Sequence, residues 1–217
     1  MINKWKIAAV FGVFFFCGSV GAAGTETVVF PPEPPFSVRK VTAEDVRTAK
    51  TADRPILESM FGSQADNVSR FNRIDSDSVR VGTELRVPGI PPGRTYSPMP
   101  TVIGWKAKKA VIIDLGRQFL GVYEKGRIVA SFPVSCRCCS GNGKLLSVKG
   151  KQMVSFRGRQ GGEFRVFVVS LSGGHRIRYG QLPGYGSGTD ISLKIGDAHS
   201  FFRWIGTGVV PVRIVCP

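Results

Sequence analysis

The chain has 217 residues, which is enough for one domain of ordinary size and a smaller one. Its formal net charge is +15, so its surface favours polyanionic partners. The basic residues are scattered, without a long Lys/Arg block and without a zinc-finger, homeodomain or RNA-recognition motif, which argues against a nucleic-acid partner. A generally basic, solvated surface explains this charge as well as a specific anion site does.

The N-terminus has the pattern of a secretory signal peptide. A short basic stretch precedes an apolar run over residues 7–16, and the small residues that follow permit cleavage after Ala22 or Ala23. The run is too short to span a bilayer, and no later stretch is long and apolar enough to be a transmembrane segment. We therefore expect residues 1–23 to be removed and the protein to be exported to the periplasm. Lipidation of Cys17 is a weaker alternative, because bulky residues precede it.

The next part of the chain predicts a small α+β unit. Residues 24–37 include the proline-rich stretch "PPEPPF", which we expect to be an extended linker. A compact unit then covers residues 38–88. In it, "ILESMFG" and "SQADNVSRFNRI" have apolar residues at helical spacing, and a turn at Gly82 leads into an edge strand that ends at Pro88.

A second linker, residues 89–106, is rich in proline and glycine and separates this unit from a domain over residues 107–217. In that domain "KAVIIDLGRQFLGVYEKGRIVASFPVS" predicts two or three strands with a tight turn at Glu124–Gly126. "EFRVFVVSLSG" and "VVPVRIVC" predict further strands. "DAHSFFRWIGTG" predicts one helix with a single apolar stripe. The fold class is therefore mostly β, with a C-terminal helix and strand.

The stretch "FGSQADNVSRFNRIDSDSVRVGTELRVP" resembles the second part of a LysM module, a small βααβ unit that binds the glycan of peptidoglycan or chitin. Where that family has a "GDTL"-type opening, this chain has "KTADRPIL". The resemblance implies that Phe71, Asn72, Ile74 and the turn at Gly82 serve the binding groove or the fold around it. The alternative is a helical linker domain without a glycan ligand.

Residues 108–217 resemble an L,D-transpeptidase catalytic domain. "VIIDLGRQFLGVYEKGRIVASFPVS" is similar to that family's opening strands, and "GGEFRV" resembles its "TP-small-G-x-F-x-I" loop, with Arg159 and Gln160 in place of Thr-Pro. "LPGYGSGTDISL" resembles the region that reads "LPGYPASHGCIRL" in the family. "DAHSFFRWIGTGVVPVRI" resembles its closing helix and strand. The resemblance implies a β-sandwich or barrel that acts on peptidoglycan.

The family's active-site motif is degenerate here. In the family, a cysteine thiolate attacks the carbonyl before the terminal D-amino acid of a peptidoglycan stem peptide. A histidine assists it, and backbone donors with an arginine hold the oxyanion. When the final "I-x-L" is matched, Ser187 takes the place of the motif's serine, Gly188 its histidine, Asp190 its cysteine and Ser192 its arginine. The loop is one residue short, so the register could slip by one, but no register places a cysteine there.

The role of Asp190 is open from the sequence. A carboxylate is a poor attacker of amides, so a nucleophilic role is disfavoured. Because "GSGTD" is rich in turn-forming residues, we expect Asp190 to cap a turn or a helix. His175 lies close in sequence, but the motif does not set its role.

Four cysteines remain after the signal peptide, and an even number in an exported protein indicates disulfides. They are Cys136, Cys138, Cys139 and Cys216. A zinc site is weakly supported, because the second half of a paired CxxC pattern is absent. We expect no metal and no cofactor. One of the three clustered cysteines, Cys136, Cys138 or Cys139, could also be a relocated nucleophile.

The sequence therefore predicts a cell-wall-associated pseudoenzyme of the periplasm that binds peptidoglycan and lacks the Cys/His/Arg motif. One alternative is an active L,D-transpeptidase, or another peptidoglycan-modifying enzyme, that uses a relocated cysteine. The other alternative is a basic structural protein of the envelope, which would adhere to anionic envelope polymers in general.

Overall fold

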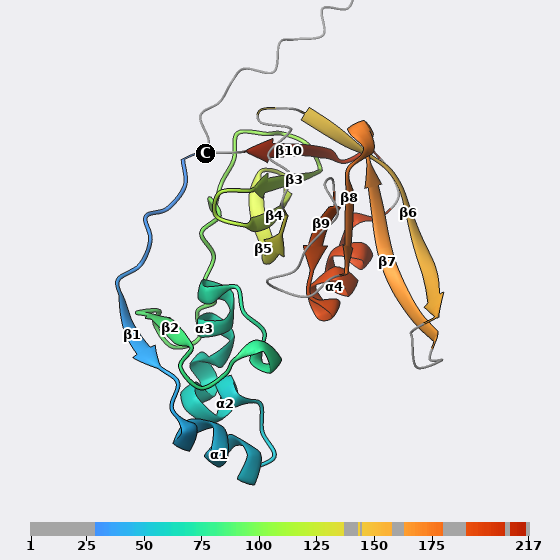
Figure 1. Ribbon diagram of the computed structural model, residues 1–217. Helices are drawn as coiled ribbons and strands as arrows, with labels where there is room; N and C mark the ends of the chain where they lie inside the picture. Colours follow the sequence, from blue (N-terminus) through green and yellow to red (C-terminus); the bar gives the residue numbers. More distant parts are fainter. Residues whose placement is uncertain are drawn as a thin grey trace, which may run out of the picture.

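The computed structural model describes residues 29–136, 143, 145–157, 163–179, 190–206 and 209–215. The predicted signal peptide, residues 1–23, lies outside them. Within the described residues, no helix is long and apolar enough to cross a membrane. The described chain forms two units, a small one with two strands and three α-helices and a larger one built around a β-barrel (Figure 1).

The small unit is a strand, three helices and a strand. Its elements are β1 (Phe36–Lys40), α1 (Ala43–Thr51), α2 (Ile56–Phe61), a short 3₁₀ turn (Gly62–Gln64), α3 (Ala65–Asn72), a second 3₁₀ turn (Ser76–Ser78) and β2 (Glu84–Pro88). The two strands pair antiparallel. The helices predicted at α2 and α3 are present, and so is the strand that ends at Pro88.

Sequence reasoning did not find α1, because this helix has almost no apolar stripe and buries only Ala49. The signal that could have found it is its N-terminal cap. The Thr42 side chain accepts a hydrogen bond from the Asp45 amide, and the Asp45 carboxylate accepts one from the Thr42 amide. This reciprocal arrangement satisfies two amide groups at the helix start that would otherwise lack partners.

The larger unit is an eight-stranded barrel with one helix. Its elements are β3 (Lys109–Asp114), β4 (Phe119–Glu124), β5 (Arg127–Ser135), β6 (Leu145–Arg157), β7 (Glu163–Leu171), a 3₁₀ turn (Ser172–Gly174), β8 (Arg176–Tyr179), β9 (Asp190–Leu193), α4 (Ile195–Ile205) and β10 (Pro211–Val215). The strands close in the order β10-β3-β4-β5-β9-β8-β7-β6. Neighbours are antiparallel, except that β10 runs parallel to β3 and β8 parallel to β9. The predicted mostly β fold, with a C-terminal helix and strand, is confirmed.

The tight turn between β4 and β5 is where the sequence predicted it. Lys125 and Gly126 both have positive φ, 49° and 78°, as in the two-residue hairpins whose twist matches the flanking strands. A Cβ atom at Gly126 would lie 2.5 Å from the carbonyl oxygen of Ile103. Glycine is therefore required here both by the backbone angle and by the close approach of the neighbouring loop.

The main core fills the barrel and includes α4. The helix contributes Ala198, Phe201 and Ile205, which form the apolar stripe that the sequence predicted. They pack against inward-facing strand residues, among them Ile177 and Ile191 from the parallel pair β8 and β9. Because side chains alternate along a strand, the residues between these point to the other face of the sheet, where the candidate site lies.

A separate core joins the two units. Residues 89–108 form no helix or strand beyond one bridge from Val102 to Arg127, yet Tyr96, Met99 and Ile103 are buried there. They pack with Phe71 of α3 and with residues of β3 and β4 on the face that points away from the barrel core. The segment that the sequence predicted as a linker thus carries part of the hydrophobic packing between the units.

Candidate functional site

Asp190, at the position matched to the family's cysteine, is the first residue of β9 and is 1% exposed. In the parallel pairing of β8 with β9, Arg176 lies beside Asp190 and Arg178 lies beside Ser192. Residues paired in this way present their side chains to the same face of the sheet. Four polar residues are therefore gathered on the face opposite Ile177 and Ile191.

Two arginines hold the Asp190 carboxylate. Arg176 donates a hydrogen bond from Nε to Oδ1 at 2.8 Å and another from Nη2 to Oδ2 at 3.3 Å, and the Nε of Arg178 forms an ion pair with Oδ2 at 2.8 Å. Charge-assisted, two-pronged contacts of this kind are among the strongest polar interactions in proteins. The sequence predicted a cap at Asp190, whereas the structure places it in a strand as the centre of an ion triplet. We name this set, Asp190 with Arg176 and Arg178, the arginine clamp.

Sequence reasoning gave neither arginine a role in the site. The signal that could have found them is the alternation in "HRIRY", which places two cations on one face of a short strand and leaves the isoleucine for the core. Their partner follows 14 residues after Arg176 in the chain, in a strand that was not predicted as separate from the loop before it.

The other predicted catalytic positions fall in different places. Ser187 and Gly188 lie outside the described residues. Ser192 is buried at 3% exposure and pairs in register with Ser135 of β5. His175 is 5% exposed, and its Nδ1 has no hydrogen-bond partner within the part of the chain that the structure describes. His175 directly precedes β8, and no contact of its ring with Asp190 is present among the described residues.

Cys136 follows β5 and belongs to a disulfide. Its side chain packs against the barrel core, and its backbone amide and carbonyl both bind the side-chain amide of Gln118, at 2.9 and 3.2 Å. A sulfur in a disulfide offers no thiolate, so Cys136 is not a nucleophile in this state. The other three cysteines, Cys138, Cys139 and Cys216, lie outside the described residues, so the full disulfide set stays a prediction.

The four residues predicted for glycan binding have packing or turn positions. Phe71 is 7% exposed and meets the Tyr96 ring edge-on, with centroids 4.8 Å apart, in the core between the units. Ile74 packs against the core of the small unit. Gly82 has φ +89° and donates its amide to the Val41 carbonyl.

Asn72 joins α3 to β2. Its Nδ2 donates to the carbonyls of Val68 and Arg86 at 2.8 and 2.7 Å, and its Oδ1 accepts from the Arg86 amide at 2.8 Å. All of these contacts are internal to the small unit. Asn72, like Phe71, Ile74 and Gly82, therefore serves the fold in this structure, and a role of these residues in glycan binding stays a prediction.

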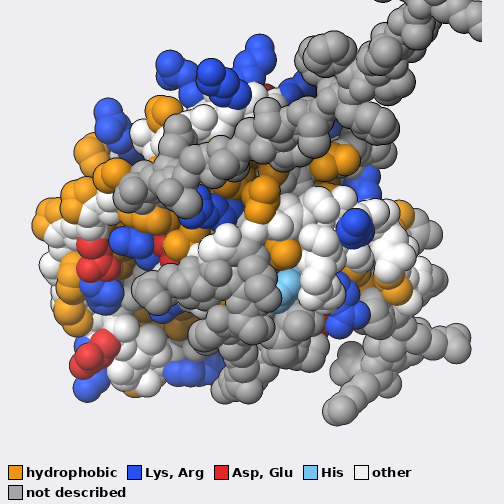
Figure 2. All heavy atoms as spheres, turned by 90° about the horizontal axis from the view of Figure 1, so that it is seen from above, with side chains coloured by type: hydrophobic (Ala, Val, Ile, Leu, Met, Phe, Trp, Pro, Cys, Tyr) orange, Lys and Arg blue, Asp and Glu red, His pale blue; other side chains and the backbone are white. Residues whose placement is uncertain are grey.

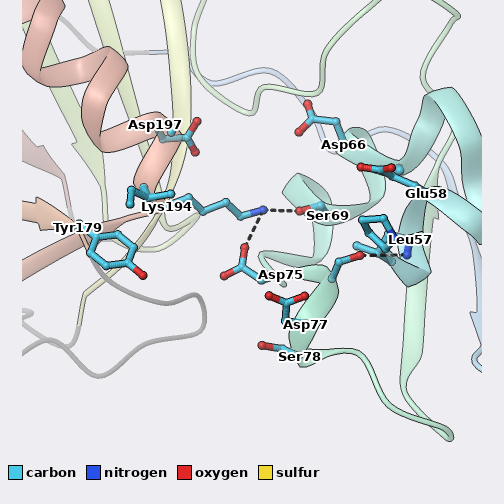
Figure 3. Close-up of a pocket in the computed structure, with 15 residues that line it drawn as sticks. Leu57, Glu58, Asp66, Ser69, Asp75, Asp77, Ser78, Tyr179, Lys194 and Asp197 are labelled. Atoms are coloured by element: carbon cyan, nitrogen blue, oxygen red, sulfur yellow. Dashed lines mark hydrogen bonds and ion pairs between the residues drawn. The ribbon is translucent and has the colours of Figure 1, made fainter. Parts of the chain in front are cut away.

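A groove with a volume of about 550 Å³ lies between the two units, with α3 and the turn at 76–78 on one side and the start of α4 on the other (Figure 3). Five carboxylates line it, from Glu58, Asp66, Asp75, Asp77 and Asp197. Lys194 reaches across it and binds Ser69 Oγ at 2.5 Å and Asp75 Oδ1 at 3.0 Å. The groove is acidic, whereas Lys and Arg outnumber Asp and Glu on the face seen in Figure 2.

Asp197, in the first turn of α4, has a carboxylate with a perturbed pKa. Burial raises its pKa, and the nearby charges of Arg70 and Lys194 offset only part of that rise. Burial also lowers the pKa of Arg70 from its ordinary value. Both shifts arise because removal from water disfavours the charged form of each group.

We expect Asp197→Asn to raise the melting temperature slightly at neutral pH. The folded-state pKa lies above the ordinary value of 3.8, so the folded protein binds more protons than the unfolded chain between these two values. Stability is therefore lost as pH rises through this window, and Asn removes that loss. Thermal unfolding across a pH series should show a difference in melting temperature between Asp197→Asn and the wild type. This difference should disappear when the pH falls below the ordinary aspartate pKa of 3.8. A difference that stays the same at every pH would contradict this account, because it would not come from the titration of Asp197.

Among the described residues, no three His, Cys, Asp or Glu side chains are grouped so as to hold a metal ion. The site therefore consists of the arginine clamp on the barrel, with the acidic groove as a separate feature between the units.

Neither a protein-family model nor a curated protein matches the chain. Among solved structures, it is similar to several L,D-transpeptidases. L,D-transpeptidase 1 of Mycobacterium tuberculosis aligns at 16% identity over 49% of this chain and 62% of that chain, with a TM-score of 0.37. This chain thus spans less than two thirds of the length of that mycobacterial protein.

Two further structures align over more of the chain. The L,D-transpeptidase of Stackebrandtia nassauensis has 14% identity over 86% of this chain and 98% of that one, with a TM-score of 0.44. The L,D-transpeptidase of Xylanimonas cellulosilytica has 19% identity over 85% and 99%, also with a TM-score of 0.44.

Proposed function

We propose that the protein is an exported, peptidoglycan-binding pseudoenzyme with an L,D-transpeptidase-like barrel. The proposal rests on the burial and the ion pairs of the Asp190 carboxylate. The sequence matches its position to the family's nucleophile, and the side chain there is a buried carboxylate paired with two arginines. This arrangement suits the binding of a ligand and not acyl transfer.

The chemistry of acyl transfer requires parts that this chain replaces together. A carboxylate engaged by Arg176 and Arg178 is a poor attacker of an amide, because its lone pairs already accept hydrogen bonds and its charge is neutralised. Gly188 stands for the assisting histidine and Ser192 for the arginine of the motif. Residues of a catalytic set act as a unit, so the loss of several removes nearly all activity.

The small unit supports a location at the cell wall. Its order, a strand, three helices and an antiparallel strand, is that of the βααβ module predicted over residues 38–88 with one additional helix, and its first strand begins at Phe36. The predicted signal peptide, residues 1–23, and the four remaining cysteines fit export to the oxidising periplasm. We propose peptidoglycan as the main partner.

Sedimentation with purified sacculi tests this function. The mature chain, residues 24–217, should pellet with sacculi and should continue to do so as the salt concentration rises, because contacts within a binding site are less screened by salt than charges on the exposed surface. A basic protein of similar size is the control, since its adhesion should be lost in salt. If the mature chain is released in parallel with this control, the protein is a basic structural protein of the envelope instead. The whole chain is needed, because Phe71 packs into the core shared with the barrel.

A further inference from the structure

We propose that Arg176 and Arg178 form a binding site for the C-terminal carboxylate of a peptide, and that Asp190 is the positioning residue that holds both guanidinium groups. The inference rests on the proposed function and deepens it, because it names the group of the stem peptide that the degenerate site recognises. In this view the site has exchanged covalent chemistry for charge recognition.

The charge balance of the clamp leaves room for one anion. Two guanidinium groups carry two positive charges, and the Asp190 carboxylate neutralises one of them. Asp190 is 1% exposed, whereas the side chains of Arg176 and Arg178 are 51% and 37% exposed. The neutralising carboxylate is therefore covered, whereas the excess positive charge on the two guanidinium groups is accessible to a ligand.

The donors of the clamp are only partly used. A guanidinium group has five N–H donors in a fixed plane. Asp190 engages Nε and Nη2 of Arg176 but only Nε of Arg178. Within the described residues, the Nη groups of Arg178 donate no hydrogen bond. We propose that they bind the incoming acceptor.

The geometry of β8 places both arginine side chains on the same face of the sheet. They are two residues apart on β8, so their backbone positions are about 7 Å apart on the same face. Asp190 lies on the neighbouring strand, accepts hydrogen bonds from Nε and Nη2 of Arg176, and forms an ion pair with Nε of Arg178. The two hydrogen bonds fix the guanidinium plane of Arg176. An arginine held in a fixed plane loses less side-chain entropy when it binds, which favours affinity for a planar acceptor.

A carboxylate fits this site better than a phosphate does. Arginine binds both groups through paired N–H donors. The clamp has an excess of one positive charge, which matches the single charge of a carboxylate and not the higher charge of a phosphate at neutral pH. A peptide that ends in a free carboxylate is the ligand of this class that the proposed function supplies.

The test compares one ligand in two forms. The mature chain is titrated with a peptidoglycan tetrapeptide that has a free C-terminal carboxylate, and with the same peptide amidated at that end. Because charged hydrogen bonds are lost with the amide, we expect the protein to bind the amidated peptide with an affinity lower by about 10-fold or more. Equal affinity for the two peptides, or no saturable binding of the free acid at millimolar concentration, would overturn the proposal. Tighter binding of inorganic phosphate than of the free acid would also overturn it.

The matched variant combines Arg176→Gln, Arg178→Gln and Asp190→Asn. It removes the whole ion triplet, so no buried charge is left without a partner. We expect it to bind the two peptides equally weakly. Arg203→Gln, on the exposed side of α4, removes the same net charge and should bind as the wild type does. A triple variant that still prefers the free acid would rule out the clamp as the site.

The same variants separate this inference from the proposed function. If the triple variant and the wild type both pellet with sacculi, and the wild type binds the two peptides equally, the arginine clamp is not a carboxylate site, whereas the proposed peptidoglycan binding is supported. If the wild type does not pellet with sacculi but prefers the free acid, the clamp stands while the proposed function fails.

Discussion

Replacement of both Arg176 and Arg178 with Gln, with Asp190 left in place, should lower the free energy of unfolding by about 3–5 kcal/mol. The reason is that the Asp190 carboxylate is buried and would lose both of its cationic partners. Urea unfolding monitored by circular dichroism measures the change. Either single replacement should cost less, because one guanidinium group remains.

The control for this prediction adds Asp190→Asn to the double variant. Removal of the buried negative charge of Asp190 should restore most of the lost stability. Removing both partners of an ion pair costs much less than removing one of them alone. A double variant as stable as the wild type would show that Asp190 does not depend on the two arginines. A triple variant no more stable than the double variant would show that the loss comes from packing.

Replacement of Arg70 with Ala should lower the free energy of unfolding by about 2–4 kcal/mol and loosen the small unit from the barrel. Arg70 lies on α3 and is 8% exposed. Its Nε donates to the Tyr96 carbonyl at 3.1 Å, and its Nη2 donates to the carbonyl and hydroxyl oxygens of Ser131 on β5. Truncation would leave these buried acceptors without a donor, and the half-buried Asp197 would also lose a nearby positive charge.

Limited proteolysis, combined with urea unfolding, distinguishes a local from a global effect of this change. Cleavage within residues 89–108 should become faster in Arg70→Ala, because Tyr96 on this segment is held by Arg70. Arg94→Ala is the control, since that side chain is exposed on the same segment. Arg70→Lys should have an intermediate effect, because it keeps the charge but loses the planar fork. Unchanged cleavage in Arg70→Ala would contradict this role.

Much of the fold could be predicted because its signals are local. The apolar stripe of α4 and the turn at Lys125–Gly126 each follow from a few adjacent residues, and both are present in the structure. Helix α1 was missed because its stabilising signal is a polar cap and not an apolar pattern. The buried role of Tyr96 was missed because it depends on contacts with α3 and β4 that composition does not reveal.

The candidate site was predicted only in part, for a related reason. Sequence matching located Asp190 as the residue in the nucleophile position, but not its environment. That environment depends on the parallel pairing of β8 with β9, which aligns Arg176 with Asp190 across strands. Register between strands is a long-range property, so the ion triplet could not be predicted from the loop motif alone.

We propose that this barrel binds peptidoglycan stems without performing acyl transfer on them. To test this, the wild type and Asp190→Cys are incubated with tetrapeptide-bearing muropeptides, and protein and products are analysed by mass spectrometry. The two arginines would favour a thiolate in the variant, but no histidine is matched to donate a proton to the leaving amine. We therefore expect no thioacyl adduct, no released D-alanine and no L,D-cross-linked dimer from either protein. Turnover by the wild type would contradict the claim, and turnover that is blocked by alkylation and lost in Cys136→Ser would identify an enzyme with a relocated cysteine.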